Sequence, residues 1–251
     1  EWGIKDTISN LSGMFAMAVW DKELNQLSLI RDRLGEKPLY YGWQGEGANK
    51  TFIFGSELKP FKNHPQFENN IDRNSLALYM RYNYVPAPHS IYENIMKLEP
   101  GMLATITLAS GSLLKEKYWD ALSVAKEGLK NPFQGNEDSA TDELEKILKK
   151  SISQQMLSDV PLGAFLSGGV DSSLVVALMQ EESTRPVKSF TIGFNEEEFN
   201  EAKYAKKVAN HIGTEHTDLY VSSKQALDII PDLPKFYSEP FSDSSQIPTY
   251  L

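Results

Sequence analysis

The chain has 251 residues, of which 41% are hydrophobic and 24% charged, a composition typical of a folded globular protein rather than of a disordered or membrane protein. Its net charge of −9 argues against a nucleic-acid-binding surface, since neutralising phosphates takes clustered Lys and Arg. Cysteine is absent, which excludes a disulfide framework and a cysteine nucleophile within this stretch. No apolar run approaches the ~20 residues that cross a bilayer. We therefore expect a cytoplasmic protein with neither a membrane nor a nucleic-acid partner.

Both ends of the chain have the pattern of cuts through continuing structure. The chain begins at Glu1 with no initiator methionine and no secretory leader, and it ends at Leu251 with no capping or tapering pattern. We therefore expect a fragment of a longer protein.

Up to about residue 119 the pattern favours β-strands. Residues 15–21 are apolar at nearly every position, which predicts a strand buried on both faces, and residues 27–31 predict its hairpin partner. Two further strand pairs are expected, 39–43 with 51–56 and 102–107 with 113–119, and a helix is expected at 72–82 with Asp72 as its N-cap. Stacked antiparallel sheets with few helices fit this half best.

Between residues 120 and 137 the periodic pattern is lost, and Gly, Asn, Pro and Gln accumulate, which predicts a linker. A helix is expected next, because apolar residues recur at helical spacing from Leu144 to Met156. Ser139 followed by Asp142 gives this helix a variant of the capping signal that is weaker than the Glu/Gln form.

A glycine-rich turn, residues 167–173, lies between the apolar runs 161–166 and 174–179. We predict a strand, a turn and a helix, with serine hydroxyls and backbone amides gathered at the positive end of the helix. Such a turn is an anion site, and the carboxylate of Asp171 could hold a magnesium ion that bridges to a phosphate. The turn lacks the Gly-Lys-Ser/Thr of kinase-type phosphate loops, which favours pyrophosphate as its ligand. The alternative is an ordinary Gly/Ser turn with an Asp in the first helical turn.

The alternation of strand and helix continues after the turn. Strand 187–194 is followed by a helix over 200–212, which ends at Gly213, and by strand 217–221. Repeated strand–helix units predict a parallel sheet with helices on both faces, and ligands of such sheets lie off the carboxyl ends of the strands. The glycine-rich turn and residues 191–194 both occupy such ends, so we expect them to converge on one crevice.

Seven segments together carry a resemblance to a known family. They are residues 11–16, 31–41, 56–59, 158–163, 167–173, 189–194 and 239–241. Through them the chain resembles the glutamine-hydrolysing asparagine synthetase family over essentially its whole length. The resemblance implies an α+β glutaminase domain of the N-terminal-nucleophile type, built as an antiparallel sheet sandwich, and then an α/β parallel-sheet ATP-pyrophosphatase domain, each present in part. The expected bounds are 1–119 for the glutaminase domain, 120–137 for the linker and 138–251 for the synthetase domain.

The resemblance also implies roles for individual residues. Asp171 would be a magnesium ligand, and Leu166 and Ile192 would line the adenosine pocket. The residues that would bind ATP are Leu166, Ser167, Gly168, Gly169, Val170, Asp171, Ser172, Ser173, Ile192 and Gly193. The family activates aspartate with ATP to give a β-aspartyl adenylate and pyrophosphate, and ammonia from glutamine then displaces AMP. The implied cofactors are ATP and Mg²⁺, and the implied partners are aspartate, glutamine and ATP, with a homodimer as a candidate assembly.

Departures from the family's pattern concern catalysis. In the family, the nucleophile of glutamine hydrolysis is a cysteine at the mature N-terminus. Because this chain contains no cysteine, no catalytic residue of glutamine hydrolysis is assigned in it. A second acidic, glycine-rich motif and a downstream lysine of the synthetase half would lie beyond Leu251. We therefore expect these residues alone to be inactive in glutamine hydrolysis and in synthesis.

Other polar and aromatic residues have structural interpretations. Five charged residues could form a catalytic cluster, but we expect them to order a turn between strands and the domain interface: Arg31, Asp32, Arg33, Glu36 and Lys37. Surface or packing roles are expected for four histidines that share no metal-ligand spacing: His64, His89, His211 and His216. Core or interface positions are expected for Tyr79, Tyr82, Tyr84 and Tyr92. Glu239 could face the crevice on the substrate side, cap a helix end or form a salt bridge.

Three hypotheses of function follow. The first is asparagine synthesis from aspartate, glutamine and ATP. The second keeps the adenylation and amidation chemistry but takes another carboxylate acceptor, such as a sugar acid, a peptide or a β-lactam precursor. The third is a non-enzymatic relative that keeps the fold without the chemistry. The intact turn argues against the third, because a decayed site would be expected to lose Asp171 or a glycine.

Overall fold

The computed structural model of the chain describes residues 2–194, 200–243 and 245–250. The chain forms two compact units, and each unit is built from two separate segments of the sequence. Unit 1 contains Glu1–Pro132 and Asp232–Ser244, whereas unit 2 contains Phe133–Pro231 and Ser245–Leu251. Within the described residues, no helix has the length and apolar character needed to cross a membrane. Unit 1 contains antiparallel sheets and unit 2 a parallel sheet, in agreement with the α+β and α/β halves expected from the sequence.

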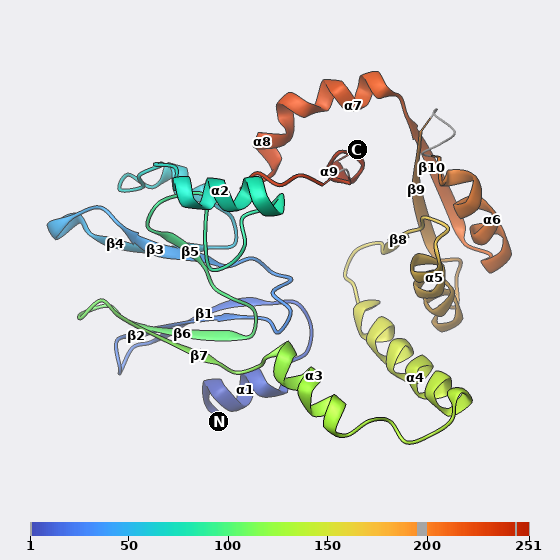
Figure 1. Cartoon of the computed structure of the whole chain (residues 1–251), viewed down its shortest axis with the longest axis horizontal. Helices are drawn as coiled ribbons and strands as arrows, with labels where there is room; N and C mark the ends of the chain where they lie inside the picture. The colour runs from blue at the N-terminus through green and yellow to red at the C-terminus, as the bar shows by residue number, and fades with distance from the viewer. Residues whose placement is uncertain (1, 195–199, 244, 251) are drawn as a thin grey trace. The chain divides into compact units, whose positions relative to one another are not determined.

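Unit 1 is built on two antiparallel sheets (Figure 1). The first has the order β1-β2-β6-β7 and consists of β1 (Ala16–Asp21), β2 (Gln26–Arg31), β6 (Met102–Thr107) and β7 (Ser112–Lys117). The second has the order β4-β3-β5 and consists of β3 (Tyr40–Gln44), β4 (Thr51–Gly55) and β5 (Ile95–Lys97). The predicted pairs β1–β2, β3–β4 and β6–β7 are confirmed. β5 was not predicted, because three residues are too few to show an alternating pattern.

The two sheets pack against each other through a shared hydrophobic core. Leu29 of β2 and Ile106 of β6, both fully buried, lie in one cluster with Tyr41 of β3. Tyr40 is the neighbour of Tyr41 in the strand and points to the opposite face, where it joins a second cluster with Leu58. The second sheet is therefore apolar on both faces, and its two clusters anchor the loops that surround it.

The expectation that residues 15–21 form a strand buried on both faces was wrong. β1 lies at the edge of its sheet, and Val19 and Trp20 are 39% and 43% exposed. An apolar run shows which residues favour burial, but the number of neighbours that a strand acquires is a property of the whole sheet.

Helix α2 (Arg73–Tyr82) begins at its predicted N-cap. The side chain of Asp72 accepts a hydrogen bond from the backbone N–H of Asn74 at 2.9 Å. The helix ends at Asn83, whose φ of 66° is left-handed, a conformation that Asn tolerates better than most residues. The other helices of unit 1 are α1 (Gly3–Asn10), α3 (Ala121–Lys130) and α8 (Leu233–Phe236), with 3-10 turns at Gly47–Asn49 and Pro60–Asn63, and a further 3-10 turn, Ile230–Asp232, spans the boundary from unit 2 to unit 1.

Helix α3 lies within the segment that was predicted to lack regular structure. Asp120 is its N-cap and accepts from the backbone N–H of Ser123 at 3.1 Å. The helix buries none of its residues, so its cap and its helix-forming Ala, Leu and Lys residues stabilise it locally. The predicted start of the next helix was also wrong. α4 (Glu137–Gln155) begins at Asn136, whose side chain accepts from the backbone N–H of Ser139 at 2.9 Å.

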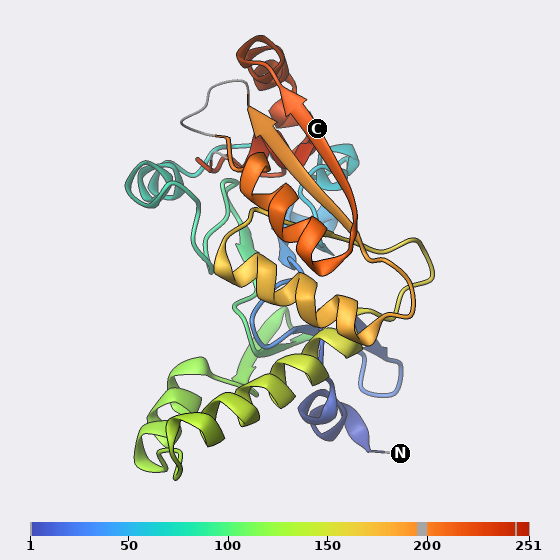
Figure 2. The ribbon, with the colours of Figure 1, turned by 90° about the vertical axis from the view of Figure 1, so that its right-hand side faces the viewer.

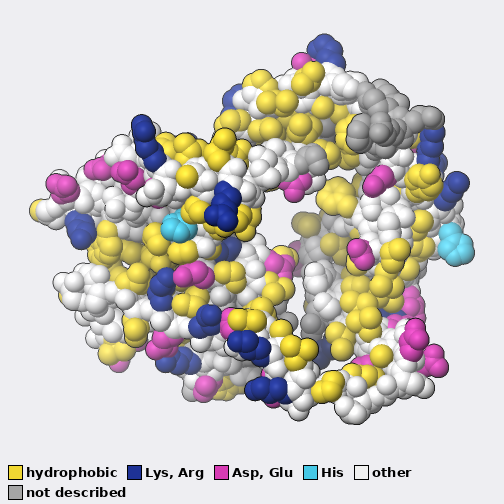
Figure 3. All heavy atoms as spheres, in the orientation of Figure 1, with side chains coloured by type: hydrophobic (Ala, Val, Ile, Leu, Met, Phe, Trp, Pro, Cys, Tyr) yellow, Lys and Arg dark blue, Asp and Glu magenta, His cyan; other side chains and the backbone are white. Residues whose placement is uncertain are grey.

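Unit 2 contains a three-stranded parallel sheet in the order β10-β9-β8. Its strands are β8 (Gly163–Phe165), β9 (Lys188–Phe194) and β10 (Glu215–Val221). Besides α4, its helices are α5 (Val170–Glu182), α6 (Ala202–Ile212), α7 (Ser223–Ile229) and α9 (Gln246–Tyr250). The predicted end of α6 is confirmed, since Gly213 follows it with a left-handed φ of 85°. The surface along α7 is largely hydrophobic (Figure 3), and Leu227 is 65% exposed.

Helices α5 and α6 lie side by side on one face of the parallel sheet (Figure 2). Val176 of α5 and Ala205 of α6 share a buried cluster with Leu166, which directly follows β8. On the opposite face, Phe190 remains 38% exposed beside Phe165, its partner in register. The second helical layer expected there is limited, in the part of the chain that the structure describes, to the short α9, which helps to form a cleft beside Phe190.

Candidate nucleotide site

The glycine-rich turn connects β8 to α5, so the predicted succession of strand, turn and helix is confirmed. Gly169 is the N-cap of α5, and the first backbone N–H groups of the helix are those that an α-helix leaves without internal partners. The 13 residues of α5 align their peptide dipoles so that this end carries partial positive charge. The turn therefore presents hydrogen-bond donors and a favourable potential to an anion.

Two serine hydroxyls brace the turn from within. Ser167 Oγ and Ser172 Oγ lie 2.8 Å apart, and Ser172 Oγ also accepts from the backbone N–H of Ser167 at 3.2 Å. The backbone N–H of Gly169 donates to Ser167 Oγ at 3.2 Å. The hydroxyl of Ser173 is buried and has no hydrogen-bond partner among the described residues. An unpaired buried hydroxyl costs about 1–3 kcal/mol, so Ser173 is a destabilising polar group within the first turns of α5.

Gly168 is required by the packing of the turn on α6. Its φ of 80° is left-handed, and a Cβ there would lie 2.7 Å from the backbone N of Ala205 and 2.9 Å from the backbone C of Tyr204. Gly169 has an ordinary φ of −75°, and the nearest atom to a Cβ there would be Ser167 Oγ, at 3.3 Å. The two glycines thus differ in role, since the first packs against protein and the second leaves the outer side of the turn open.

The carboxyl ends of β8 and β9 meet beside the turn. The backbone N–H of Leu166 donates to the Phe190 carbonyl at 2.8 Å, and the hydroxyl of Thr191 donates to the Leu166 carbonyl. A cleft of about 360 Å³ opens at this point. Its lining consists of Phe165, Leu166, Ser167, Phe190, Thr191, Ile192, Glu201, Ser245, Pro248 and Thr249. The two segments that we expected to converge therefore contribute to the same cleft.

Three of the ten residues predicted to bind ATP line this cleft, namely Leu166, Ser167 and Ile192. The remaining turn residues are Gly168, Gly169, Val170, Asp171, Ser172 and Ser173, and they form the adjoining end of α5. Gly193 packs into the protein, because a Cβ there would lie 2.9 Å from the Tyr220 ring and 3.0 Å from the Ala202 Cβ. The cleft walls are rich in apolar residues and the helix end is rich in donors, which suits the base and the phosphates of a nucleotide respectively.

Seven lining residues were outside the predicted ATP-binding set: Phe165, Phe190 and Thr191 lie on the two predicted strands, and the other four were missed altogether. Glu201 is the N-cap of α6, and Ser245, Pro248 and Thr249 belong to the last described segment of the chain. No local motif marks these positions, because their approach to the cleft depends on how α6 and α9 pack.

Asp171 is the candidate metal ligand, and it lies exposed in the first turn of α5. Within the described residues, no three or more His, Cys, Asp or Glu side chains are grouped to hold a metal ion. Mg²⁺ usually keeps several waters and takes one or two carboxylates together with substrate phosphates. One exposed carboxylate at an anion-binding helix end therefore fits a magnesium ion that arrives with a nucleotide, and does not fit a dedicated protein cage.

In unit 1, the charged residues at 31–37 order a turn, which confirms that part of the expectation, and their role at a domain interface stays a prediction. The guanidinium of Arg31 donates to three backbone carbonyls at 2.5–3.0 Å, those of Gly35, Lys37 and Leu98. Burial lowers the pKa of Arg31, and the neighbouring Asp32 carboxylate opposes this shift. Asp32 is 1% exposed and accepts from three backbone N–H groups, those of Phe15, Glu36 and Lys37, at 2.9–3.4 Å. These bonds satisfy buried backbone groups, which is a structural role.

Two of the four histidines have identified packing partners. His64 Nδ1 accepts from the backbone N–H of Gln66 at 3.3 Å. His216 Nδ1 lies 2.9 Å from the hydroxyl of Ser189, and burial lowers the pKa of His216, although the charge of Asp218 opposes the shift. Both environments agree with the packing roles expected from the sequence.

The tyrosines divide between the core and the surface of unit 1. Tyr92 is 8% exposed, and Tyr79 packs against the same hydrophobic cluster. Tyr82 and Tyr84 are 45% and 53% exposed, which excludes the core for these two, and an interface position stays a prediction for them.

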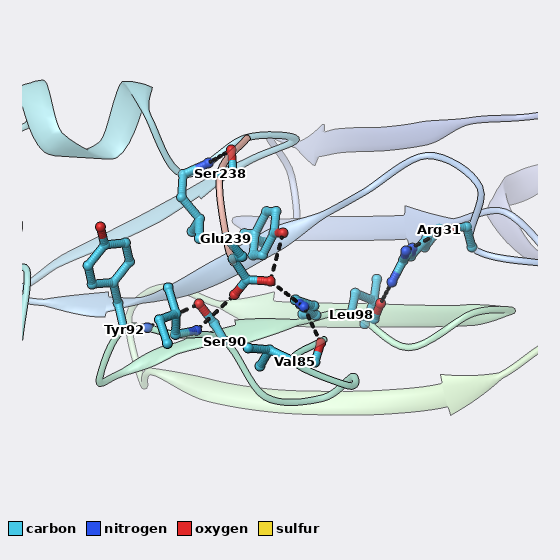
Figure 4. Close-up of polar contacts among 12 residues, drawn as sticks. Arg31, Val85, Ser90, Tyr92, Leu98, Ser238 and Glu239 are labelled. Carbon is cyan, nitrogen blue, oxygen red and sulfur yellow. Dashed lines mark hydrogen bonds and ion pairs between the residues drawn. The ribbon is translucent and has the colours of Figure 1, made fainter. Parts of the chain in front are cut away.

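Glu239 forms a salt bridge, one of the roles considered for it, and lies in unit 1 (Figure 4). Its carboxylate pairs with Lys97, accepts from the hydroxyl of Tyr40 at 3.2 Å and accepts from the backbone N–H of Ile91 at 2.8 Å. The side chains of Glu239 and Lys97 are 9% and 15% exposed. Burial and then the Glu239 carboxylate raise the pKa of Tyr40, which therefore stays protonated as a donor.

Comparisons with known proteins match both halves of the chain. Residues 1–119 match the family described as glutamine amidotransferase domain, and residues 143–251 match the family described as asparagine synthase. A putative glutamine-hydrolysing asparagine synthetase 2 of Methanocaldococcus jannaschii is 35% identical over 98% of this chain and 46% of its own length. Asparagine synthetase 1 of Bacillus subtilis is 33% identical over 98% of this chain and 37% of its own length.

The two matches define a protein that joins an amidotransferase region to a synthase region. The chain belongs to the glutamine-hydrolysing asparagine synthetase family. It spans about half the length of the first of these relatives and less of the second.

Proposed function

We propose that the glycine-rich turn and the adjoining cleft bind ATP, and that the protein uses it for glutamine-dependent amide synthesis. The observation that carries the proposal is the arrangement at the start of α5, where the first backbone N–H groups of the helix, which lack intrahelical partners, adjoin a partly apolar cleft. Leu166 and Ile192 would contact the adenosine, while the amides of the turn and of the first turn of α5 would hold the phosphates.

The chemistry that this arrangement favours is adenylation. A carboxylate of aspartate attacks the α-phosphorus of ATP, the bond from the α-phosphorus to the bridging oxygen breaks, and pyrophosphate leaves. The donors at the helix end stabilise the negative charge that develops on the pyrophosphate. A bound Mg²⁺ would supply further charge neutralisation, and Asp171 would hold it. Ammonia from glutamine then displaces AMP from the β-aspartyl adenylate and gives asparagine.

The amidotransferase half would supply the ammonia, but these 251 residues contain no cysteine to act as its nucleophile. We therefore expect the chain alone to release no ammonia from glutamine. A cytoplasmic location, a homodimeric assembly and the absence of nucleic-acid partners remain predictions from the sequence.

The test of nucleotide binding is calorimetric titration of the chain with ATP in the presence of Mg²⁺. Asp171→Asn should weaken the magnesium-dependent part of the affinity about tenfold, since a charged metal ligand is replaced by a neutral one. Asp142→Asn on the exposed side of α4 is the matched control and should leave the affinity unchanged. Equal affinities of the Asp171→Asn variant and the wild type, with and without Mg²⁺, would contradict the assignment of Asp171.

The acceptor is tested by ATP–pyrophosphate exchange in the full-length protein. Exchange that depends on aspartate supports asparagine synthesis, and exchange only with another carboxylic acid selects a different acceptor. Exchange with none of these acids would contradict adenylation and favour a relative that keeps the fold without the chemistry.

A further inference from the structure

Within unit 2, a side chain joins the carboxyl ends of β8 and β9 in addition to the backbone. The last pair in register is Phe165 with Phe190, and the next residues of the two strands are Leu166 and Thr191. The backbone N–H of Leu166 donates to the Phe190 carbonyl, and the hydroxyl of Thr191 donates to the Leu166 carbonyl. Thr191 therefore extends the contact between the strands by one residue, up to the point where the glycine-rich turn begins.

The two residues joined in this way form the floor of the nucleotide cleft. Leu166 and Thr191 both line the cleft, although they are only 1% and 5% exposed. The Leu166 side chain packs with Val176 of α5 and Ala205 of α6. A carbonyl at this depth needs a donor, because an unpaired buried polar group is costly. The donor that the structure provides for it is the hydroxyl of Thr191.

The peptide group between Leu166 and Ser167 is bonded through both of its polar atoms. Its carbonyl accepts from Thr191, and its N–H donates to Ser172 Oγ at 3.2 Å. Because a peptide group is planar, these two bonds together set the orientation of the whole unit. This peptide connects the part of the cleft proposed for the adenosine to the turn proposed for the phosphates.

The two ends of this peptide are supported unequally. On the side of the turn, Ser167 Oγ lies 2.8 Å from Ser172 Oγ and accepts from the backbone N–H of Gly169, while Gly168 packs on α6. On the side of the adenosine, the support of the carbonyl is Thr191. Without this hydroxyl the carbonyl would have to take water from the cleft, where it competes with the adenosine for space. The turn would keep its own bonds.

We propose that Thr191 is a positioning residue of the ATP site, which acts through the Leu166 carbonyl and holds the adenosine side of the cleft in its binding shape. The inference rests on the ATP-binding function proposed above and adds a residue to it. Thr191 orders the floor under the adenosine, whereas the amides of the turn hold the phosphates without its help.

The experiment compares Thr191→Val with the wild type by calorimetric titration of the full chain. Two ligands are titrated, each with Mg²⁺: ATP, which needs both parts of the site, and inorganic pyrophosphate, which needs only the turn. Valine keeps the shape of threonine and removes the hydroxyl. Thr191→Val should weaken ATP binding about twofold to tenfold, the value of one hydrogen bond, and should leave pyrophosphate binding unchanged.

Ser189→Ala is the matched control for the loss of a buried hydroxyl. Ser189 lies on β9 two residues before Thr191 and is fully buried. Its hydroxyl lies 2.8 Å from Thr214 Oγ1 and 2.9 Å from His216 Nδ1, and it does not line the cleft. Ser189→Ala should make amide hydrogen exchange along α5 and α6 faster, because unit 2 is less stable, and should change neither affinity.

A second pair of variants separates the hydroxyl from the packing of the side chain. Thr191→Ser and Thr191→Ala both lose the methyl group and differ from each other only in the hydroxyl. Thr191→Ser should retain most of the ATP affinity, and Thr191→Ala should lose as much as Thr191→Val. This pair decides the question by itself if hydrogen exchange shows that Thr191→Val does not fold.

Four results would overturn the inference: unchanged ATP affinity in Thr191→Val, equal losses for ATP and pyrophosphate, a loss of the same size in Ser189→Ala, or equal losses in Thr191→Ser and Thr191→Ala. If the wild type itself binds no ATP, the function proposed above fails, and this inference fails with it. Normal binding by the wild type together with an indifferent Thr191→Val variant refutes the inference alone.

Discussion

Replacing Gly168 with alanine should destabilise unit 2 by about 2–4 kcal/mol. The left-handed φ of 80° costs a residue with a Cβ roughly 1–2 kcal/mol. The added Cβ would lie 2.7 Å from the backbone N of Ala205, and overpacking of this kind costs about 1–3 kcal/mol. The smaller freedom of alanine in the unfolded chain offsets about 0.4–1 kcal/mol of this. Since the atoms in the way are backbone atoms of α6, a side-chain rotation cannot relieve the clash.

Gly213→Ala is the matched control for this variant. Gly213 has a similar φ of 85°, but a Cβ there would have no atom within 4 Å. The control thus carries the conformational cost without the clash, and the difference between the two variants isolates the contact with α6.

Amide hydrogen exchange along α5 and α6 measures the stability of unit 2 in these variants. The chain's four tryptophans are Trp2, Trp20, Trp43 and Trp119, all in unit 1, so tryptophan fluorescence during urea unfolding provides an internal reference that should not change. If Gly168→Ala destabilises α5 and α6 no more than Gly213→Ala does, the turn does not rest on the α6 backbone and the reasoning is refuted.

Two further predictions concern buried polar groups. Asp32→Asn should lower the free energy of unfolding of unit 1, measured by urea titration, by about 3 kcal/mol, because an amide cannot accept from all three backbone N–H groups around it. As a control, Asp21→Asn in an exposed turn should lower it by less than about 1 kcal/mol. His216 should make unit 2 less stable as the pH falls below about 7, since burial holds its folded pKa below that of the unfolded chain and the unfolded state then binds more protons. His216→Gln should remove this part of the pH dependence in hydrogen exchange and the exposed His211→Gln should not; an unchanged slope in His216→Gln would contradict the assignment.

Local signals in the sequence were strong enough to predict the elements around the candidate site. The two apolar runs and the glycines between them predicted β8, the turn and the start of α5, and Gly213 predicted the end of α6. Asp72 likewise predicted the start of α2, because an N-cap acts on amides only two or three residues away. Asn136 was missed as a cap because a later serine offered a similar signal.

The roles of residues within the site were harder to predict. Gly168 and Gly169 are the same residue type at adjacent positions, so the sequence does not distinguish their roles. The neighbouring helix α6 does, because Gly168 packs against it whereas Gly169 leaves space for a ligand. The wall formed by Ser245, Pro248 and Thr249 carries no motif and reaches the cleft through tertiary packing. The prediction that β1 is buried on both faces failed for the same reason, since the order of the strands in the sheet decides which strand lies at its edge.

The sequence by itself determined the strand, turn and helix of the nucleotide site, the order of the two halves and the family, because these depend on short-range periodicity, caps and motifs. Only the tertiary structure decided that Glu239 pairs with Lys97, 142 residues earlier in the chain, and that a segment of the synthase match is held by the amidotransferase fold. The partner of a carboxylate cannot be predicted from the sequence around it, because burial and the donors that the fold brings within reach determine which group it pairs with.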